Sequence, residues 1–265
     1  MLPGEMSVLR PRPVAVVRLE GVIGAAVRSS EFVPLLEQLR RRRRVKAVVL
    51  EVDSRGGSAS ASDYIYDAVA RLDAVKPVVA FCGNICASGG YLIACGARKL
   101  VVQPGAVVGS IGVISVRPLA EDLMRRLGLD VAVTKSGRLK DMGAPWRRPT
   151  EEEEAKEKQL VDEYFNLFLD RIERGRGMQR ERIRELATGE IFSGRQAVAA
   201  GLADQLGSME DAVKLAAETA GVPSRWRWVG PKRTLGSRLI GRFAGQAADA
   251  LWDRAVAATY PEPRC

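Results

Sequence analysis

Short runs of β-branched and other apolar residues alternate with helical patterns from Val14 onward, and this alternation restricts the fold more than any other feature. Strands that alternate with helices are typical of α/β proteins, whose sheets are largely parallel. The pattern predicts strands over 14–19, 47–52, 77–81, 100–102, 107–115 and 130–133. It predicts helices over 31–43, 61–72, 119–127, 151–174, 180–187, 194–200 and 208–220, with Thr150 as the N-cap of the longest one.

Three segments follow from this pattern: an N-terminal extension over 1–13, a main domain over 14–221 and a C-terminal extension over 222–265. The last segment carries apolar residues at helical spacing over 235–260, which predicts an amphipathic helix. Such a helix docks in the core or at a subunit contact, or it lies on a membrane surface, and the sequence leaves these possibilities open. Segment 1–13 does not have the pattern of a signal peptide, and no stretch reaches the roughly 18 apolar residues of a transmembrane helix.

Positive charge is concentrated in one short run. The net charge is +9, and residues 40–44 are consecutive arginines followed by Lys46. A basic run suits a solvated helix end, because cations favour the negative end of the helix dipole. A patch of this size also attracts acidic lipid, so peripheral contact with an anionic membrane stays open, as does a cytoplasmic location. No recognition helix accompanies the charge, so nucleic acid is not an expected partner.

The chain contains no histidine, which excludes Ser–His–Asp and Cys–His catalysis within it. If it performs acyl transfer, the base must be a lysine, a carboxylate or a terminal amine. Cys82, Cys86 and Cys95 fall in a strongly apolar stretch and are expected to be buried free thiols, with Cys265 as the fourth cysteine. Without histidine a mixed zinc site cannot be completed, and neither a metal nor a cofactor is expected.

Two glycine-rich turns follow predicted strands: D-S-R-G-G-S from Asp53 and C-A-S-G-G-Y from Cys86. Paired glycines let a backbone approach a ligand closely and leave N–H groups exposed. Neither turn matches the phosphate-binding patterns G-x-x-x-x-G-K-[ST] and G-x-G-x-x-G. Ser88 opens the helix after the second turn, where a serine serves either as a plain N-cap or as a nucleophile beside oxyanion-stabilising amides.

Five sequence blocks occur in order along the chain, beginning at Asp53, Ile85, Gly109, Ser136 and Gly189. They read D-S-x-G-G, I-C-A-S-G-G-Y, G-S-I-G-V, S-G-x-x-K-D and G-E-I-F-S-G. Together they resemble the signal peptide peptidase A family from about residue 14 to residue 207. The spacing of 52 residues from Ser88 to Lys140 (140 − 88) is also that of the family.

The resemblance assigns roles to particular residues. It implies that Ser88 is the nucleophile, that Lys140 is the general base and that Ser110 helps to hold the lysine amine. It implies an oxyanion hole formed by the backbone amides of Gly57 and Gly89. From composition alone Lys140 would be an ordinary charged loop lysine, because a lysine acts as a base only after it loses its proton.

The resemblance also implies the Clp protease/crotonase-like fold, in which repeated β-β-α units give a mainly parallel sheet flanked by helices. It implies a homo-oligomer, ring- or dome-shaped, and peptide substrates that are short or unfolded, remnant signal peptides among them. Two departures lie near the expected site: Arg55 replaces a common proline, and Cys86 replaces a small or apolar residue. Two rival functions stay open, a crotonase-like acyl-CoA enzyme and a catalytically silent scaffold at a membrane.

Overall fold

The computed structural model describes residues 12–231 of the 265-residue chain, which fold as two compact units. Gly112–Phe168 form the second unit, and the segments on either side of it form the first. The helix expected over 235–260 lies outside the described residues. Among the helices of the described part, none combines the length and the apolar character needed to cross a bilayer.

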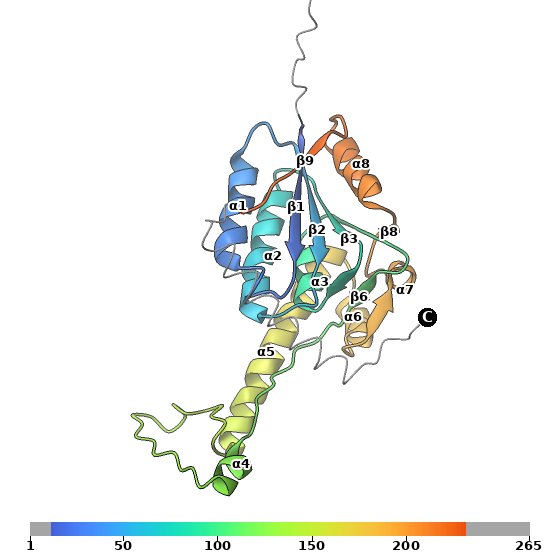
Figure 1. Cartoon of the computed structure of the whole chain (residues 1–265). Coiled ribbons are helices and arrows are strands. Elements are labelled where there is room, and N and C mark those ends of the chain that lie inside the picture. Colours follow the sequence, from blue (N-terminus) through green and yellow to red (C-terminus); the bar gives the residue numbers. More distant parts are fainter. Residues whose placement is uncertain (1–11, 232–265) are drawn as a thin grey trace, which may run out of the picture. The chain divides into compact units, whose positions relative to one another are not determined.

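The first unit is built on a six-stranded sheet in which all neighbouring strands are parallel (Figure 1). The strands are β1 (Val14–Glu20), β2 (Ala47–Asp53), β3 (Val78–Cys82), β5 (Lys99–Val102), β8 (Gln205–Leu206) and β9 (Trp226–Trp228). Their order is β8-β5-β3-β2-β1-β9. The sequence pattern predicted neither β8 nor β9, the two edge strands, which pair with β5 and β1. The predicted α/β fold with a mainly parallel sheet is confirmed.

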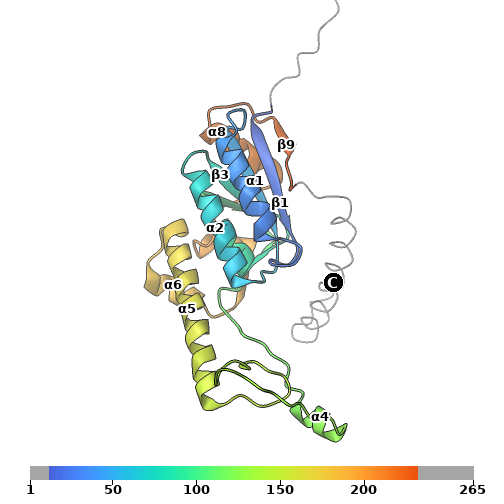
Figure 2. The same ribbon diagram turned by 90° about the vertical axis from the view of Figure 1, so that its left-hand side faces the viewer.

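Helices cover both faces of this sheet. α1 (Ser29–Arg41) and α2 (Ala59–Asp73) lie on one face, and α8 (Met209–Thr219) lies on the other (Figures 1 and 2). Val16 and Val49 belong to the cluster packed against α8, while Val17 and Leu50 are buried toward the opposite face. Strands buried on both sides have continuous apolar runs, which explains the sequence AVVLEV in β2.

A second sheet in the same unit contains β4 (Ile85–Ala87), β6 (Val107–Gly109) and β7 (Ile191–Ser193), in the order β4-β6-β7. Three short helices complete the unit: α3 (Gly89–Ala94), α6 (Arg180–Leu186) and α7 (Gly194–Ala199). The strand predicted over 107–115 is wrong beyond Gly109. There, Gly109 and Ser110 have φ angles of 105° and 48°, which end the extended backbone.

The second unit contains α4 (Glu121–Arg126) and most of α5 (Glu151–Arg176), whose last residues belong to the first unit. The strand predicted over 130–133 is wrong. Val131 and Val133 are 44% and 43% exposed, and no strand pairs with them in the described chain. A β-branched run without a pairing partner has little to stabilise it as a strand. The N-cap at Thr150 is confirmed, since the Glu153 N–H donates to Thr150 Oγ1 at 3.3 Å.

Gly175, near the end of α5, lies against Cys95, the residue that follows α3 in the first unit. A Cβ added there would lie 1.9 Å from the carbonyl oxygen of Cys95. Gly175→Ala gains helix propensity but forces a backbone clash, so we expect the free energy of unfolding to fall by about 1–3 kcal/mol. Urea denaturation followed by circular dichroism measures this change. Gly105→Ala is the control, because no atom lies within 4 Å of the added Cβ; equal midpoints for both variants would contradict the close packing.

Candidate active site

Ser88 and Ser110 follow two paired strands at the same edge of the smaller sheet. β4 ends at Ala87 and β6 ends at Gly109, and these two residues are in register. The Ser88 N–H donates to the Gly109 carbonyl oxygen at 2.8 Å, which fixes the start of the bend. Carboxyl ends of parallel strands are where open α/β folds bind ligands. The structure therefore brings these two sequence-predicted residues together.

Both serines have a strained backbone. The φ angles are 51° at Ser88 and 48° at Ser110, and no other non-glycine residue in 12–231 has a positive φ. Such conformations cost about 1–3 kcal/mol each and persist only where the surrounding structure enforces them. At Ser88 the bend turns the chain from β4 into α3 and leaves the residue half-buried. A hydroxyl on a sharp strand-to-helix bend is both accessible and fixed in direction.

The turn after β2 packs directly on Ser88. At Gly56, where φ is 103°, an added Cβ would lie 2.7 Å from Ser88 Cβ and 3.0 Å from Ser88 Oγ. Ser54 orders this turn: its hydroxyl donates to the Gly21 carbonyl oxygen at 2.7 Å and accepts from the Gly56 N–H at 3.1 Å. Only glycine fits at position 56, which gives a physical reason for the first glycine of the D-S-x-G-G block.

The backbone N–H groups of Gly57 and Gly89 have a common feature. Ile23 and Gly57 form an isolated parallel β-bridge, in which Ile23 bonds to the two residues that flank Gly57. The Ile23 N–H donates to the Gly56 oxygen at 2.8 Å, and the Ser58 N–H donates to the Ile23 oxygen at 2.9 Å. The N–H of Gly57 itself therefore points away from Ile23. Gly89 is the first residue of α3, where an amide has no partner inside the helix. Within residues 12–231 neither amide donates a hydrogen bond.

The three cysteines of the described chain are buried free thiols, as expected; Cys265 lies outside it. Burial raises the pKa of Cys95 to about 12. A hydrogen bond with Cys82, together with burial, raises the pKa of Cys86 well above its ordinary value. Protonated, buried thiols are poor nucleophiles, so Cys86 does not compete with Ser88. Residues 12–231 contain no group of three or more His, Cys, Asp or Glu side chains that could hold a metal ion.

Lys140 belongs to the second unit, whereas Ser88, Ser110, Gly57 and Gly89 belong to the first. Its side chain is exposed, and its N–H donates to the Gly137 carbonyl oxygen at 3.1 Å to close a turn. Neither helix nor strand occurs over 136–149, the segment that contains Lys140.

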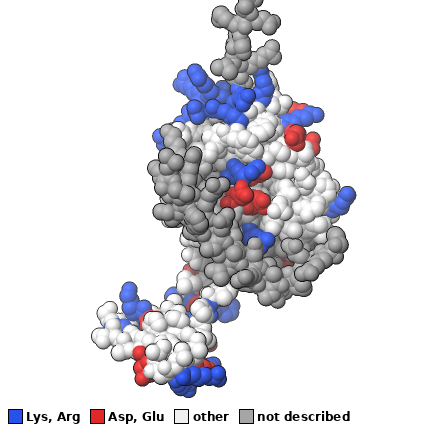
Figure 3. All heavy atoms as spheres, in the orientation of Figure 1, with Lys and Arg blue, Asp and Glu red and all other residues white. Residues whose placement is uncertain are grey.

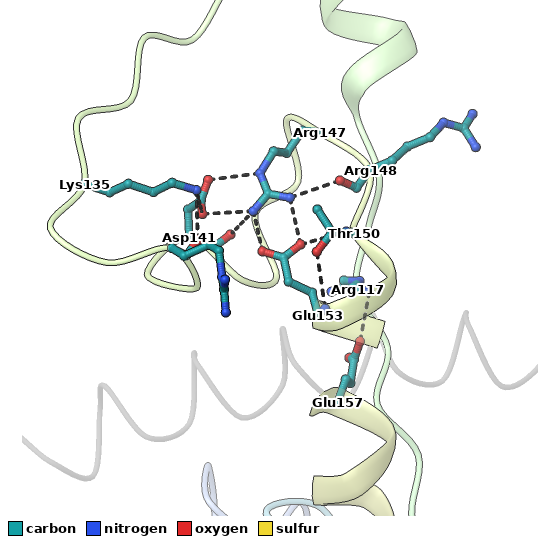
Figure 4. Close-up of polar contacts among 9 residues, drawn as sticks. Arg117, Lys135, Asp141, Arg147, Arg148, Thr150, Glu153 and Glu157 are labelled. Carbon is teal, nitrogen blue, oxygen red and sulfur yellow. Dashed lines mark hydrogen bonds and ion pairs between the residues drawn. The ribbon is translucent and has the colours of Figure 1, made fainter. Parts of the chain in front are cut away.

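Arg147 joins the turn that carries Lys140 to the start of α5 (Figure 4). Its Nε donates to Asp141 Oδ2 at 2.9 Å, and its two terminal nitrogens donate to the Glu153 carboxylate at 2.8 and 2.5 Å. Lys135 Nζ donates to Asp141 Oδ1 at 2.5 Å. Glu153 is 1% exposed and also accepts the Thr150 N–H at 2.9 Å. Sequence reasoning gave Arg147 and Glu153 no role, although T-x-x-E before a helix is the signal of a capping box.

The two carboxylates of this network are held in their ionised form. Hydrogen bonds from Arg147 and then Lys135 hold the pKa of Asp141 well below its usual range. Arg147 and the Thr150 N–H lower the pKa of Glu153 to about 2. Because both pKa values are lower in the folded chain, the stabilisation is complete above the ordinary carboxylate pKa of about 4. It is lost as the pH falls from there toward the folded values.

The sequence profile of Peptidase family S49 matches residues 70–223, a span that includes Ser88, Ser110 and Lys140. The chain belongs to peptidase family S49. A second profile, Clp protease, matches residues 15–106 of this S49 peptidase, a span that contains β1 to β5 and the turn after β2. The family predicted from the five sequence blocks is confirmed, and the chain is a serine protease of that family.

Named relatives agree with this assignment. A candidate signal peptide peptidase SppA of Enterococcus faecium is 34% identical over 234 residues, which cover 80% of this chain and 68% of the relative. The chloroplastic serine protease SPPA of Arabidopsis thaliana is 29% identical over 222 residues, which cover 79% of this chain and 33% of the relative.

Among solved structures, a mutant of the 1510-N membrane-bound stomatin-specific protease matches with a TM-score of 0.54 at 16% identity. The match covers 84% of this chain and 100% of that chain. At this identity it shows a shared fold alone. Together with the Clp protease profile, it confirms the predicted Clp protease-like fold.

Replacing Glu153 by Gln should loosen the turn that carries Lys140. A neutral amide cannot form the ion pair with Arg147, so we expect trypsin to cleave after Lys135 or Arg147 several-fold faster than in the parent protein. Mass spectrometry of the digested full chain measures the rate. Glu154→Gln is the matched control, because Glu154 is the next residue and is exposed. If both variants were cleaved at the same rate, the Arg147–Glu153 pair would not hold this turn.

Proposed function

We propose that this S49 peptidase hydrolyses peptide bonds in short or unfolded peptides, remnant signal peptides among them, with Ser88 as nucleophile and Lys140 as general base. The strained bend at Ser88 carries the proposal, because it packs against Gly56 and lies beside two amides that donate no hydrogen bond within residues 12–231. Strain of this kind is found where a functional group must be held in one direction. The name of the Enterococcus faecium relative, signal peptide peptidase, supports the substrate class.

The proposed reaction proceeds in two halves. Ser88 Oγ adds to the carbonyl carbon of the scissile bond while its proton passes to the uncharged Nζ of Lys140. The N–H groups of Gly57 and Gly89 donate to the resulting oxyanion. The Lys140 ammonium then gives its proton to the leaving amine, and an ester remains on Ser88. A water that Lys140 deprotonates hydrolyses this ester and restores the hydroxyl, while the Ser110 hydroxyl holds the amine in position.

A polar cavity beside the turn supports peptide binding. It has a volume of about 360 Å³ and is lined by Gly24, Arg28, Ser29, Ser30, Ser58, Ser60, Ala61 and Tyr64. Ser58 directly follows Gly57, so the cavity adjoins one of the two proposed oxyanion donors. Hydroxyl groups in such a cavity can hydrogen-bond a peptide backbone and leave little apolar surface for large side chains. The proposal therefore includes a preference for small side chains next to the cleaved bond.

The general base requires an environment that the second unit alone does not provide. Lys140 is exposed there, whereas a lysine acts as a general base only in its uncharged form, which burial favours. The proposal therefore includes a homo-oligomer, ring- or dome-shaped, in which the Lys140 amine is buried beside Ser88 of the same or a neighbouring protomer. In support, the second unit has many exposed apolar side chains, which mark association surfaces: Ile114, Val116, Leu119, Leu123, Leu127 and Leu129 are each more than half exposed.

Ser88→Ala and Lys140→Ala should each lower the hydrolysis of a fluorogenic peptide by about 1,000-fold or more, because each removes a partner of a two-residue catalytic unit. Lys158→Ala, an exposed lysine of α5, should keep the parent rate. A fluorophosphonate probe should label the parent at Ser88. A catalytically silent scaffold would not react with the probe. Full activity of either catalytic variant would refute the proposed dyad. Binding of coenzyme A, measured by calorimetry, would favour an acyl-CoA enzyme instead.

The parent enzyme should also become more active as the pH rises from 6 to 10, because an ammonium cannot accept the proton of Ser88. The rate of probe labelling should follow the same curve. A flat profile would exclude a lysine base.

Light scattering at micromolar concentration should give a mass several times the 28.8 kDa of the single chain. Changing Ile114 and Val116 to Asp places charges on exposed apolar positions of the second unit and should shift the particle toward smaller species with lower peptidase activity. Val75→Asp is the control, since Val75 is 59% exposed in the first unit. A 28.8 kDa parent particle with full activity would contradict the proposed assembly.

A further inference from the structure

A basic surface lies at the amino ends of three neighbouring strands of the larger sheet, and we call it the basic edge. It consists of Arg12, Arg41, Arg42, Arg43, Arg44, Lys46, Arg225 and Arg227. Two backbone hydrogen bonds join its segments: Lys46 N–H donates to the Pro13 oxygen at 2.8 Å, and Val14 N–H donates to the Arg225 oxygen at 3.2 Å. Lys and Arg gather at this end of the first unit in Figure 3.

The cations of the basic edge have no carboxylate partners within residues 12–231. Nearby arginines do: Arg40 pairs with Glu37 at 2.8 Å and Arg18 pairs with Glu51 at 2.5 Å. The negative end of α1 is already satisfied, because Lys76 Nζ donates to the Leu39 and Arg42 oxygens at 2.7 and 2.8 Å. The arginine run is therefore not needed as a cap for α1.

Three arginines of the basic edge line a cavity. The cavity has a volume of about 500 Å³ and is lined by Arg12, Ser224, Arg225, Trp226, Arg227 and Trp228. Arg225 Nη1 and Arg227 Nε are buried, and neither has a hydrogen-bond partner in the described chain. Buried donors of a cation without a partner are costly, and the fork of an arginine matches the oxygens of a phosphate. The cavity thus has the chemistry of a phosphate-binding site.

Trp226 and Trp228 give this site an aromatic rim. The two rings meet edge to face with their centroids 5.2 Å apart, and Trp228 is 49% exposed. Trp226 packs against the core beneath α8. Tryptophan beside arginine and lysine is the combination that proteins place at the boundary between lipid and water. A nucleic acid strand would need a series of stacking platforms, and only one of these two rings is exposed enough to serve.

We propose that the basic edge binds the surface of an anionic phospholipid membrane, with a lipid phosphate in the cavity between Arg225 and Arg227. Clusters of four to eight basic residues attract acidic lipid, and the basic edge has this size. Ser88 lies at the opposite, carboxyl ends of the strands, so a protein bound in this way keeps its nucleophile uncovered. The proposal does not depend on the catalytic role of Ser88 or Lys140.

Vesicle flotation with the full chain tests the proposal. We expect at least tenfold tighter binding to vesicles of phosphatidylcholine with one-third phosphatidylglycerol than to vesicles of phosphatidylcholine alone, and weaker binding in high salt. The triple variant Arg42→Glu, Arg43→Glu, Arg44→Glu should lose at least tenfold in binding. The double variant Arg225→Gln, Arg227→Gln should bind anionic vesicles severalfold more weakly than the parent protein. Millimolar inorganic phosphate should not release the parent protein from vesicles, because a lipid surface offers many contacts at once.

The matched control reverses three exposed cations elsewhere in the first unit: Arg174→Glu, Arg184→Glu and Arg195→Glu. It changes the net charge by the same amount and should bind vesicles within about twofold of the parent protein. Circular dichroism verifies that all variants are folded. Equal losses in both triple variants, equal binding to neutral vesicles, or tighter binding to single-stranded RNA than to anionic vesicles would each overturn the proposal.

Discussion

The left-handed backbone at Ser88 is the constraint on which the arrangement of the first unit depends. The pairing of Ala87 with Gly109 fixes the end of β4, and α3 begins two residues later, so the chain must turn within one residue. The corner can form only because glycines surround it. A Cβ at Gly56 would lie 2.7 Å from Ser88 Cβ, and one at Gly90 would lie 2.8 Å from the Ser54 oxygen. The glycines of both turns are thus required by the close approach of two backbones.

The two units are stabilised in different ways, and this difference bears on the proposed dyad. The first unit has an apolar core between its sheet and the helices on both faces. The second unit leaves most of its large apolar side chains exposed and has Glu153, an ionised group, among its few buried residues. The turn with Lys140 is therefore held by charged hydrogen bonds from Arg147 and Lys135. A general base needs surroundings of low polarity. A lysine on this turn has such surroundings only when another protein surface covers it.

The sequence predicted the parts of the fold that depend on local patterns. Apolar runs identified the central strands, because a strand buried on both faces needs no polar residues. Prediction failed where the ends or the pairing of a strand depend on contacts between distant segments. β6 ends at Gly109, where the backbone adopts a positive φ, and β9 forms because Trp226 pairs with Val14 of β1. Ser88 and Ser110 were identified by family resemblance, but their shared strain is visible only in the structure. The Arg147 network escaped prediction because hydrogen bonds from one loop arginine to Asp141 and Glu153 leave no periodic signal in the sequence.

Parallel strands give the first unit two chemically different ends. All strands of the larger sheet run in the same direction, so their amino ends lie on one side of the sheet and their carboxyl ends on the other. The residues before the strands and those after them are therefore separated by the strand length, about 20 Å for seven residues. The basic edge is made from residues that precede β1, β2 and β9 or begin them, whereas the bend at Ser88 and the turn at Gly56 follow strands. Positive charge can therefore accumulate at the amino ends of the strands without disturbing the backbone amides at their carboxyl ends. Because interactions between exposed charges are largely screened over that distance in physiological salt, contact at one end and chemistry at the other can be altered independently.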